Sequence, residues 1–273
     1  MGDTTSAPEP GNRGASLLIA VLACVALIVA VRAYGVPGQP DTGSSAEVVD
    51  GADIDLASLT ATTTEARIKA APVDGNPDQA PDGLVVHPKR AVPVFDVPDG
   101  TAIAKVGPHQ FGDTWLPVVD RQRGWVQVLL PSRPNGSTGW LRAAGLQRAH
   151  SRFLVRVHLG SRTMGLYENG AEIGSWPVAV GAGDTPTPTG RTFLLGQMVD
   201  DQQSFSPLIL PLGTHSPTLD SYGGGPGTVA IHGWTDASVF GKAVSHGCIR
   251  VPDEALAELR SVPLGTAVLI DEA

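Results

Sequence analysis

The segment VSHGCIR, residues 244–250, brings together three side chains that can do chemistry. His246 lies two residues before Cys248 and Arg250 lies two residues after it, so on an extended backbone the three share one face. An imidazole near a thiol favours the thiolate and can carry its proton, which is what a cysteine nucleophile requires. A guanidinium adds a fixed positive charge that could hold a carboxylate. The segment therefore indicates nucleophilic chemistry centred on Cys248.

Two further features next to the thiol fit that chemistry. His232 ends the apolar run TVAIHGW, residues 228–234, and a following loop could bring it back beside Cys248. Gly247, directly before Cys248, lets the backbone approach a substrate closely and leaves amide N–H groups free to hold an oxyanion. A thiol, a histidine and free amides are the parts of an acyl-transfer site.

The compartment of the thiol follows from the apolar run ASLLIAVLACVALIVAV, residues 15–31, which holds the other cysteine, Cys24. The run is longer than a usual signal-peptide core, so residues 15–36 are predicted as a transmembrane anchor, with a cleaved signal peptide as the alternative. Residues 1–14 are then a cytoplasmic tail. The remaining chain is expected outside the cytoplasm, held at the cell membrane by this single span. An exported cysteine normally pairs, so the partnerless Cys248 is either inert or retained for reactivity.

The composition predicts a mainly β protein. The 33 glycines and 23 prolines, against few aromatic residues, favour many turns and short strands over long helices. The net charge of −8 excludes nucleic acid as a partner, because phosphate backbones bind to basic faces.

Residues 37–83 are rich in Pro, Gly, Asp, Thr, Ser and Ala and contain almost no large apolar side chains. Such a stretch cannot bury enough apolar surface to offset its ordering entropy. We therefore predict a flexible linker, which would let the globular part reach a target away from the membrane.

Residues 84–149 read as short strands and turns, and the segment GWVQVLLPSRPNGSTGWL within them resembles a bacterial SH3-like barrel. The pair Asn135-Gly136 predicts a type I′ hairpin turn, and the formal glycosylation sequon at the same position is the alternative. The resemblance implies a binding or spacing module with no catalytic group.

Residues 150–273 form a second β-rich unit, predicted as a β-sandwich or barrel-like sheet with one packed helix. Apolar and polar residues alternate over residues 153–159, and Asn169-Gly170 predicts a type I′ turn. The helix is expected over residues 253–260, with Asp253 as its N-cap.

The motif HGW…SHGCIR resembles the signature of the L,D-transpeptidase family, whose catalytic domain is of the YkuD type. His232-Gly233 and residues 245–250 match that signature, and GAGDTPTPTGRTF, residues 181–193, resembles the proline-rich hairpin these domains carry upstream. Trp234 stands where a smaller or polar residue, often Thr, is usual. This departure bears on substrate preference and leaves the chemistry intact.

The resemblance implies a role for each motif residue. Cys248 would be the nucleophile and His232 its proton acceptor and later donor. The backbone at Gly247 and Cys248 would form the oxyanion hole, His246 would shape the pocket, and Arg250 would orient the pocket or a substrate carboxylate. The remaining residues expected to contact the substrate are Gly233, Trp234, Ser245 and Tyr222. The segment YGGGPG that begins at Tyr222 could be a mobile lid or a plain glycine loop.

The function that the resemblance implies is a peptidoglycan L,D-transpeptidase. Cys248 would attack the carbonyl group preceding the terminal D-alanine of a tetrapeptide stem, and an amine on a neighbouring stem would resolve the thioester into a 3–3 crosslink. No cofactor and no metal are implied, and a β-lactam of the carbapenem type is expected to acylate the same thiol.

Several alternatives stay open. Water could resolve the acyl-enzyme, giving an L,D-carboxypeptidase, or a protein amine could do so, attaching that protein to the wall. His232, His246 and Cys248 could instead bind zinc, although no carboxylate stands at a recognisable motif spacing to act as a base. The chain could also be a non-catalytic wall-binding protein that works through residues 84–149.

Overall fold

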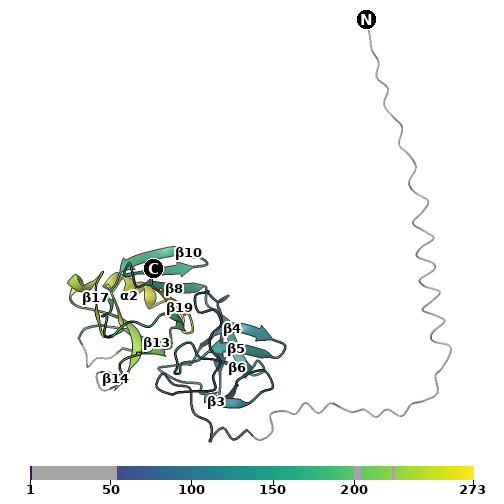
Figure 1. Cartoon of the computed structure of the whole chain (residues 1–273). Coiled ribbons are helices and arrows are strands. Elements are labelled where there is room, and N and C mark those ends of the chain that lie inside the picture. The colour runs from purple at the N-terminus through teal and green to yellow at the C-terminus, as the bar shows by residue number, and fades with distance from the viewer. Residues whose placement is uncertain (2–53, 200–203, 223–224) are drawn as a thin grey trace, which may run out of the picture. The chain divides into compact units, whose positions relative to one another are not determined.

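The computed structural model describes Met1 and residues 54–199, 204–222 and 225–273, and the residues from 54 onward belong to one compact unit (Figure 1). The expected anchor at residues 15–36, almost all of the expected tail and the linker up to residue 53 lie outside the described residues. In the part of the chain that is described, no helix is long and apolar enough to cross a membrane.

A seven-stranded antiparallel sheet occupies the region predicted as short strands and turns, in the order β3-β2-β6-β5-β4-β1-β7. Its inward side chains, among them Val86, Val128 and Leu141, are fully buried in a core that Phe193 and Leu195 of the following unit also enter. The strands are β1 (Leu84–Pro88), β2 (Val92–Phe95), β3 (Ala102–Val106), β4 (Leu116–Gln122), β5 (Trp125–Leu129), β6 (Thr138–Arg142) and β7 (Leu146–His150).

The two Asn-Gly pairs behave differently. Asn169 and Gly170 have φ angles of 50° and 81°, as a type I′ turn requires, and they join two strands of the catalytic part. The prediction of the same turn at Asn135-Gly136 is wrong, because Gly136 alone of that pair has a positive φ, of 75°. The pair lies in the loop 130–137 between β5 and β6, and the Asn135 side chain bonds to a distant segment instead of shaping a local turn.

The flexible linker predicted over residues 37–83 does not extend through residues 54–83. Ile68 is buried, and its N–H donates to Arg133 O at 2.9 Å, while Thr62 N–H donates to Lys105 O at 2.8 Å. The composition argument failed because backbone hydrogen bonds and one buried ion pair add to the few buried apolar side chains, such as Ile68, in offsetting the ordering entropy here.

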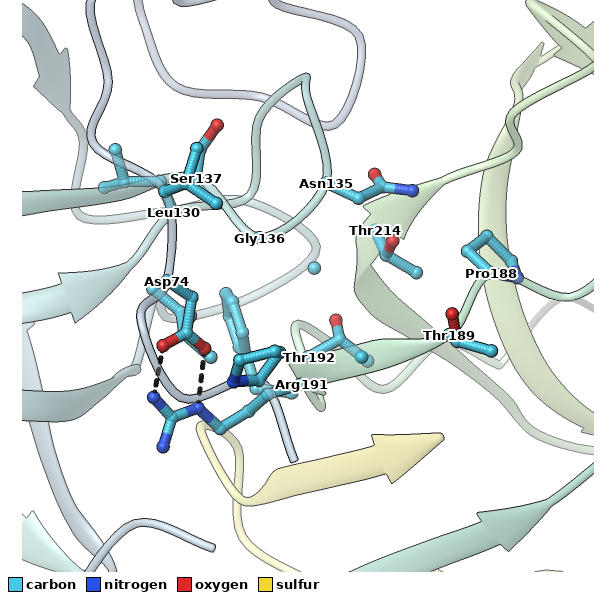
Figure 2. Close-up of a pocket in the computed structure, with 16 residues that line it drawn as sticks. Asp74, Leu130, Asn135, Gly136, Ser137, Pro188, Thr189, Arg191, Thr192 and Thr214 are labelled. Carbon is cyan, nitrogen blue, oxygen red and sulfur yellow. Dashed lines mark hydrogen bonds and ion pairs between the residues drawn. The ribbon is translucent and has the colours of Figure 1, made fainter. Parts of the chain in front are cut away.

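That ion pair joins Asp74 to Arg191 with both side chains almost completely buried, at 3% and 4% exposure (Figure 2). Nη2 and Nε of Arg191 donate to the two carboxylate oxygens at 2.6 and 2.8 Å, and Nη1 donates to Gln79 O at 2.9 Å. The pair therefore ties residues 54–83 to β12 (Gly190–Phe193), an edge strand of a five-stranded sheet.

Asp74→Ala is expected to lower the free energy of unfolding by about 3–5 kcal/mol, because it leaves the Arg191 guanidinium buried without its counter-charge. Urea unfolding of the full chain, followed by tryptophan fluorescence, measures the loss. Asp82→Ala is the matched control: it breaks an ion pair with Arg121 whose two side chains are 47% and 58% exposed, and it should cost less than about 1 kcal/mol. Equal losses in the two variants would contradict the structural role given to Asp74.

Among the described residues of 150–273, the part expected to be catalytic, two larger sheets, two two-stranded sheets and one α-helix are present. This confirms a mainly β fold with one packed helix. The five-stranded sheet has the order β10-β9-β8-β19-β12, and the three-stranded sheet has the order β13-β16-β18. Both contribute to one apolar core, with Val155, Leu210 and Ile231 among its fully buried members. The elements of the two sheets are β8 (Phe153–His158), β9 (Thr163–Glu168), β10 (Ala171–Pro177), β12 (Gly190–Phe193), β13 (Ile209–His215), β16 (Thr228–Gly233), β18 (Ile249–Val251) and β19 (Ala267–Asp271). The smaller elements are β11 (Val180–Gly181), β14 (Ser221–Tyr222), β15 (Gly225–Pro226), η1 (Ala237–Val239) and β17 (Ala243–Ser245).

Helix α2 (Asp253–Leu259) packs Ala255, Leu256 and Leu259 into this core, as the spacing of the leucines predicted. The prediction of Asp253 as its N-cap is wrong. Pro252 occupies the cap position, without a side-chain hydrogen bond, and Asp253 is the first helical residue. From there its carboxylate can only favour the positive end of the helix electrostatically.

Candidate active site

The parallel pair β16–β18 brings the two separated halves of the motif together. His232 lies opposite Arg250 in the register, and Ile231 lies opposite Ile249. Residues opposite each other in a parallel pair project to the same face, and Cys248 directly precedes β18, two residues before Arg250. His232, Cys248 and Arg250 consequently border one cavity of about 340 Å³.

His232 is held as a neutral base. Its Nδ1 lies 2.7 Å from Gly233 O, and because a carbonyl oxygen only accepts, Nδ1 carries the proton and Nε2 keeps a free lone pair. The ring is 7% exposed and packs edge-on against Phe205, with centroids 5.1 Å apart. Burial lowers the pKa of His232 to about 4, against the smaller opposing effect of the Gly233 carbonyl. At neutral pH the imidazole can therefore accept a proton.

Cys248 is a partly accessible free thiol on the same cavity. Burial raises the pKa of this thiol, while a backbone hydrogen bond from Ala230 and the charge of Arg250 act in the opposite direction. Its resting state is therefore the neutral thiol, and a base must remove the proton as the sulfur attacks. With His232 also neutral, the site is suited to general-base activation of the thiol and does not hold a preformed ion pair.

The backbone at Gly247 is only partly available to an oxyanion. Gly247 adopts φ of 112°, which favours glycine, but its own N–H donates to Ser245 Oγ at 3.1 Å. The expectation that this amide is free is therefore wrong. The N–H of Cys248 donates to no acceptor among the described residues. It is therefore the group of the motif that remains available to donate a hydrogen bond to an oxyanion.

Two of the residues predicted to contact substrate serve the framework instead. Ser245 is buried, and its hydroxyl donates to Cys248 O at 2.5 Å. Gly233 N–H donates to Ser206 Oγ at 2.7 Å, and its carbonyl orients His232. Neither Ser245 nor Gly233 lines the cavity.

Trp234 has a direct role that the sequence left open. The Arg250 guanidinium carbon lies 3.6 Å from the centroid of the Trp234 ring, a cation–π contact on the wall of the cavity. Arg250 Nε is buried and has no hydrogen-bond partner among the described residues. The indole thus fixes the position of the guanidinium at the cavity wall.

Tyr222 and His246 form another part of the rim. Their rings lie 5.2 Å apart, and Tyr222 Oη is 3.5 Å from His246 Nδ1. Tyr222 is 55% exposed, and both side chains line the cavity. His246 therefore contacts Tyr222, as expected for a residue that shapes the pocket.

The proline-rich segment supports the motif through threonines that sequence reasoning did not single out. Thr187 Oγ1 donates to Gly247 O and accepts from Gly181 N–H, each at 2.9 Å, and Thr185 Oγ1 donates to Ser245 O at 3.1 Å. The resemblance to a proline-rich hairpin identified this segment as a whole. Nothing in the sequence distinguishes these two hydroxyls from those of the other threonines in it. In the part of the chain that is described, no three His, Cys, Asp or Glu side chains gather closely enough to hold a metal ion.

Comparisons with known proteins identify relatives of this chain. The L,D-transpeptidase catalytic domain of the YkuD type matches residues 152–270. The YkuD protein of Bacillus licheniformis, which carries the L,D-transpeptidase name, is 31% identical over 167 residues, covering 58% of this chain and 94% of that protein. The YkuD protein of Bacillus subtilis is 34% identical over 118 residues, covering 43% of this chain and 65% of that protein. The chain belongs to the L,D-transpeptidase family.

Among solved structures, L,D-transpeptidase 3 of Mycobacterium tuberculosis, in complex with a faropenem-derived adduct, has a TM-score of 0.37 and 16% identity. The match covers 51% of this chain and 75% of that chain.

Thr187→Val is expected to lower kcat/KM for acyl transfer about tenfold, because Gly247 O and Gly181 N–H both lose their partner and the motif backbone can shift. Thr192→Val is the matched control, since Thr192 Oγ1 is buried without a hydrogen-bond partner among the described residues and its loss costs nothing at the site. Steady-state kinetics of both variants, with thermal unfolding alongside, separate positioning from stability. A Thr187→Val enzyme as active as the Thr192→Val enzyme would contradict this role.

Proposed function

We propose that the chain is a peptidoglycan L,D-transpeptidase that works by cysteine acyl transfer. The observation that carries the proposal is the meeting of Cys248, His232 and Arg250 on one cavity. A neutral thiol, a neutral histidine with its Nε2 lone pair free and a fixed cation are together suited to attack on a carbonyl next to a carboxylate.

Acylation begins when His232 Nε2 takes the thiol proton as Cys248 Sγ bonds to the carbonyl carbon that precedes the terminal D-alanine of a tetrapeptide stem. The N–H of Cys248 donates to the resulting oxyanion. Collapse of this intermediate breaks the amide bond, and the proton on His232 passes to the nitrogen of D-alanine, which leaves. The product is a thioester between Cys248 and the shortened stem.

Transfer follows when an acceptor amine, the side chain of a diamino acid on a neighbouring stem, attacks the thioester. His232 accepts the proton of that amine and returns it to the departing sulfur, which restores the thiol and leaves a 3–3 crosslink. Water as the acceptor would give a carboxypeptidase, and a protein amine would attach that protein to the wall. The acyl-enzyme is common to all three outcomes.

Arg250 is suited to the carboxylate of the terminal D-alanine. Its guanidinium is held by Trp234 at the cavity wall. A carboxylate there would gain a charge-assisted hydrogen bond, which selects donors that end in a free acid.

The proposal also covers location and accessory parts. Residues 15–36 would anchor the enzyme in the membrane with its catalytic part extracytoplasmic, and the seven-stranded unit, which resembles a bacterial SH3-like barrel in sequence, would act as a binding or spacing module. A carbapenem-type β-lactam would acylate Cys248, because its strained amide is an electrophile for the same thiol.

Mass spectrometry of a disaccharide-tetrapeptide incubated with the full chain tests the function. A dimer that has lost one D-alanine is the expected product. Monomer without D-alanine and without dimer would reassign the enzyme as a carboxypeptidase, and unchanged substrate would favour the non-catalytic wall-binding alternative.

A further inference from the structure

One wall of the active-site cavity comes from residues 215–222, here called the cleft-wall segment. Ser216, Leu219 and Tyr222 of this segment line the cavity. At its start Ser216 N–H donates to the carbonyl oxygen of Gly227, which also lines the cavity, at 2.7 Å. The segment follows the end of β13 and has no regular secondary structure up to β14, so its position depends on such individual contacts.

Two of these contacts come from a single side chain of the seven-stranded unit. Asn135, in the loop 130–137 of the seven-stranded unit, forms hydrogen bonds with both backbone polar groups of His215. Asn135 Nδ2 donates to His215 O at 2.8 Å, and His215 N–H donates to Asn135 Oδ1 at 2.9 Å. Figure 2 shows Asn135 directed from its loop toward β13, near Thr214. The carboxamide thus pairs with the end of β13 as a neighbouring strand would.

The position of β13 explains why such a partner is needed. β16 lies on one side of β13, and on the other side the bridges from Met198 and Leu194 reach only as far as Leu212, so the end of β13 at His215 is an edge. The β13–β16 register also shifts between Pro211 and His215. Backbone groups at the end of an edge strand lack a ladder partner and require another acceptor and donor. Asn135 supplies both at the residue where the cleft-wall segment begins.

A second contact reinforces the first but contributes little. Arg133 Nη1 lies 2.8 Å from Asp220 Oδ1, and the Asp220 side chain is 87% exposed. Exposed pairs of this kind stabilise only weakly because solvent screens them. The neutral, part-buried hydrogen bonds of Asn135 are therefore the main link between the seven-stranded unit and the cavity wall.

We propose that Asn135 is a positioning residue of the active site, which holds the cleft-wall segment in the conformation that binds the donor stem peptide. The proposal rests on the function proposed above. Preordering a binding wall removes an entropy cost from substrate binding. His232 lies on β16 and Cys248 directly precedes β18, whereas the hydrogen bonds of Asn135 go to His215 at the end of β13. Loss of Asn135 should therefore affect substrate binding more than chemistry.

Kinetics of Asn135→Ala and Asn135→Asp in the full chain test the proposal, with disaccharide-tetrapeptide as the varied substrate. Loss of the hydrogen bonds is expected to raise KM about tenfold and to leave kcat within about twofold. The rate of Cys248 alkylation by iodoacetamide should not change. The aspartate variant is nearly isosteric, and it replaces the Nδ2 donor by a charged carboxylate oxygen that repels His215 O, so it decides the question if the alanine variant fails to fold.

Gln127→Ala is the matched control, since Gln127 Nε2 makes an amide hydrogen bond to Thr138 Oγ1 inside the seven-stranded unit, away from the cavity. This variant should keep the wild-type KM at a comparable loss of thermal stability. A folded Asn135 variant with the wild-type KM would overturn the proposal. So would a parallel fall of kcat, alkylation rate and stability, since that pattern marks general damage.

Hydrogen–deuterium exchange of the same full-chain variants tests the positioning role of Asn135 independently of the proposed transpeptidase function. Faster exchange confined to residues 215–222 in the Asn135 variants supports positioning even if the wild-type chain leaves the tetrapeptide unchanged, in which case only the proposed function fails. Unchanged exchange in that segment, with an active wild type, would reject the positioning role alone.

Discussion

Replacement of Cys248 by alanine is expected to lower the rate of stem-peptide crosslinking by at least about 10⁴-fold. Without the sulfur no acyl-enzyme forms, and His232 cannot compensate because it acts by moving a proton. Mass spectrometry of the disaccharide-tetrapeptide reaction measures dimer formation, and the same method detects the stem acyl group, or an opened β-lactam, bound to the wild-type protein alone.

Cys24→Ala is the control, because it removes the other cysteine of the chain and leaves the site untouched. It should retain wild-type activity. Crosslinking that survives in Cys248→Ala would show that the thiol is not the nucleophile, and loss of crosslinking in Cys24→Ala would point to damage of the protein.

Replacement of His232 by glutamine is expected to lower kcat about 10²–10⁴-fold, the usual range for a general acid–base group. The loss should be larger than for an ion-paired cysteine, because the pKa of the Cys248 thiol is raised by burial and leaves almost no thiolate at neutral pH. Single-turnover rates of Cys248 acylation measure the effect. His109→Gln, on an exposed loop paired with Asp113, is a control that should keep full activity.

The role of His232 as a buried, neutral base also predicts how kcat/KM depends on pH. Since the pKa of His232 is lowered to about 4, the imidazole is neutral above that pH, and the base form is lost only as the pH falls through about 4. kcat/KM of the wild type should therefore stay level from pH 7 down to about 5 and fall below that. If kcat/KM instead fell near the ordinary pKa of histidine, His232 would have to be solvated. That result would contradict its assignment as a buried base.

The chemistry of the site could be predicted from local sequence. The types and spacing of His232, Cys248 and Arg250 identified the reactive groups, and alternating apolar residues identified strands such as β8 and β16. These features depend on residues close together in the chain, whose side-chain directions follow from backbone geometry. The turn at Asn169-Gly170 was predictable for the same reason.

The failures share a different origin. Asn135-Gly136 has a good local turn signal, but its side chain bonds to His215 from far along the chain. The composition of residues 54–83 predicts flexibility, but Asp74 forms a buried ion pair with Arg191, which is distant in the sequence. Competition between a local preference and a long-range partner cannot be evaluated until the partner is in place.

The sequence by itself determined the family, the mainly β character and the groups that can do the chemistry. Only the tertiary structure decided how these groups are tuned: the buried neutral state of His232, the amide of Gly247 taken by Ser245, and the Arg250 guanidinium stacked on Trp234. Burial and hydrogen-bond allocation depend on which distant segments close over a residue. The parallel pairing of β16 with β18 and the packing around it therefore set the properties of the site, and residue type alone does not.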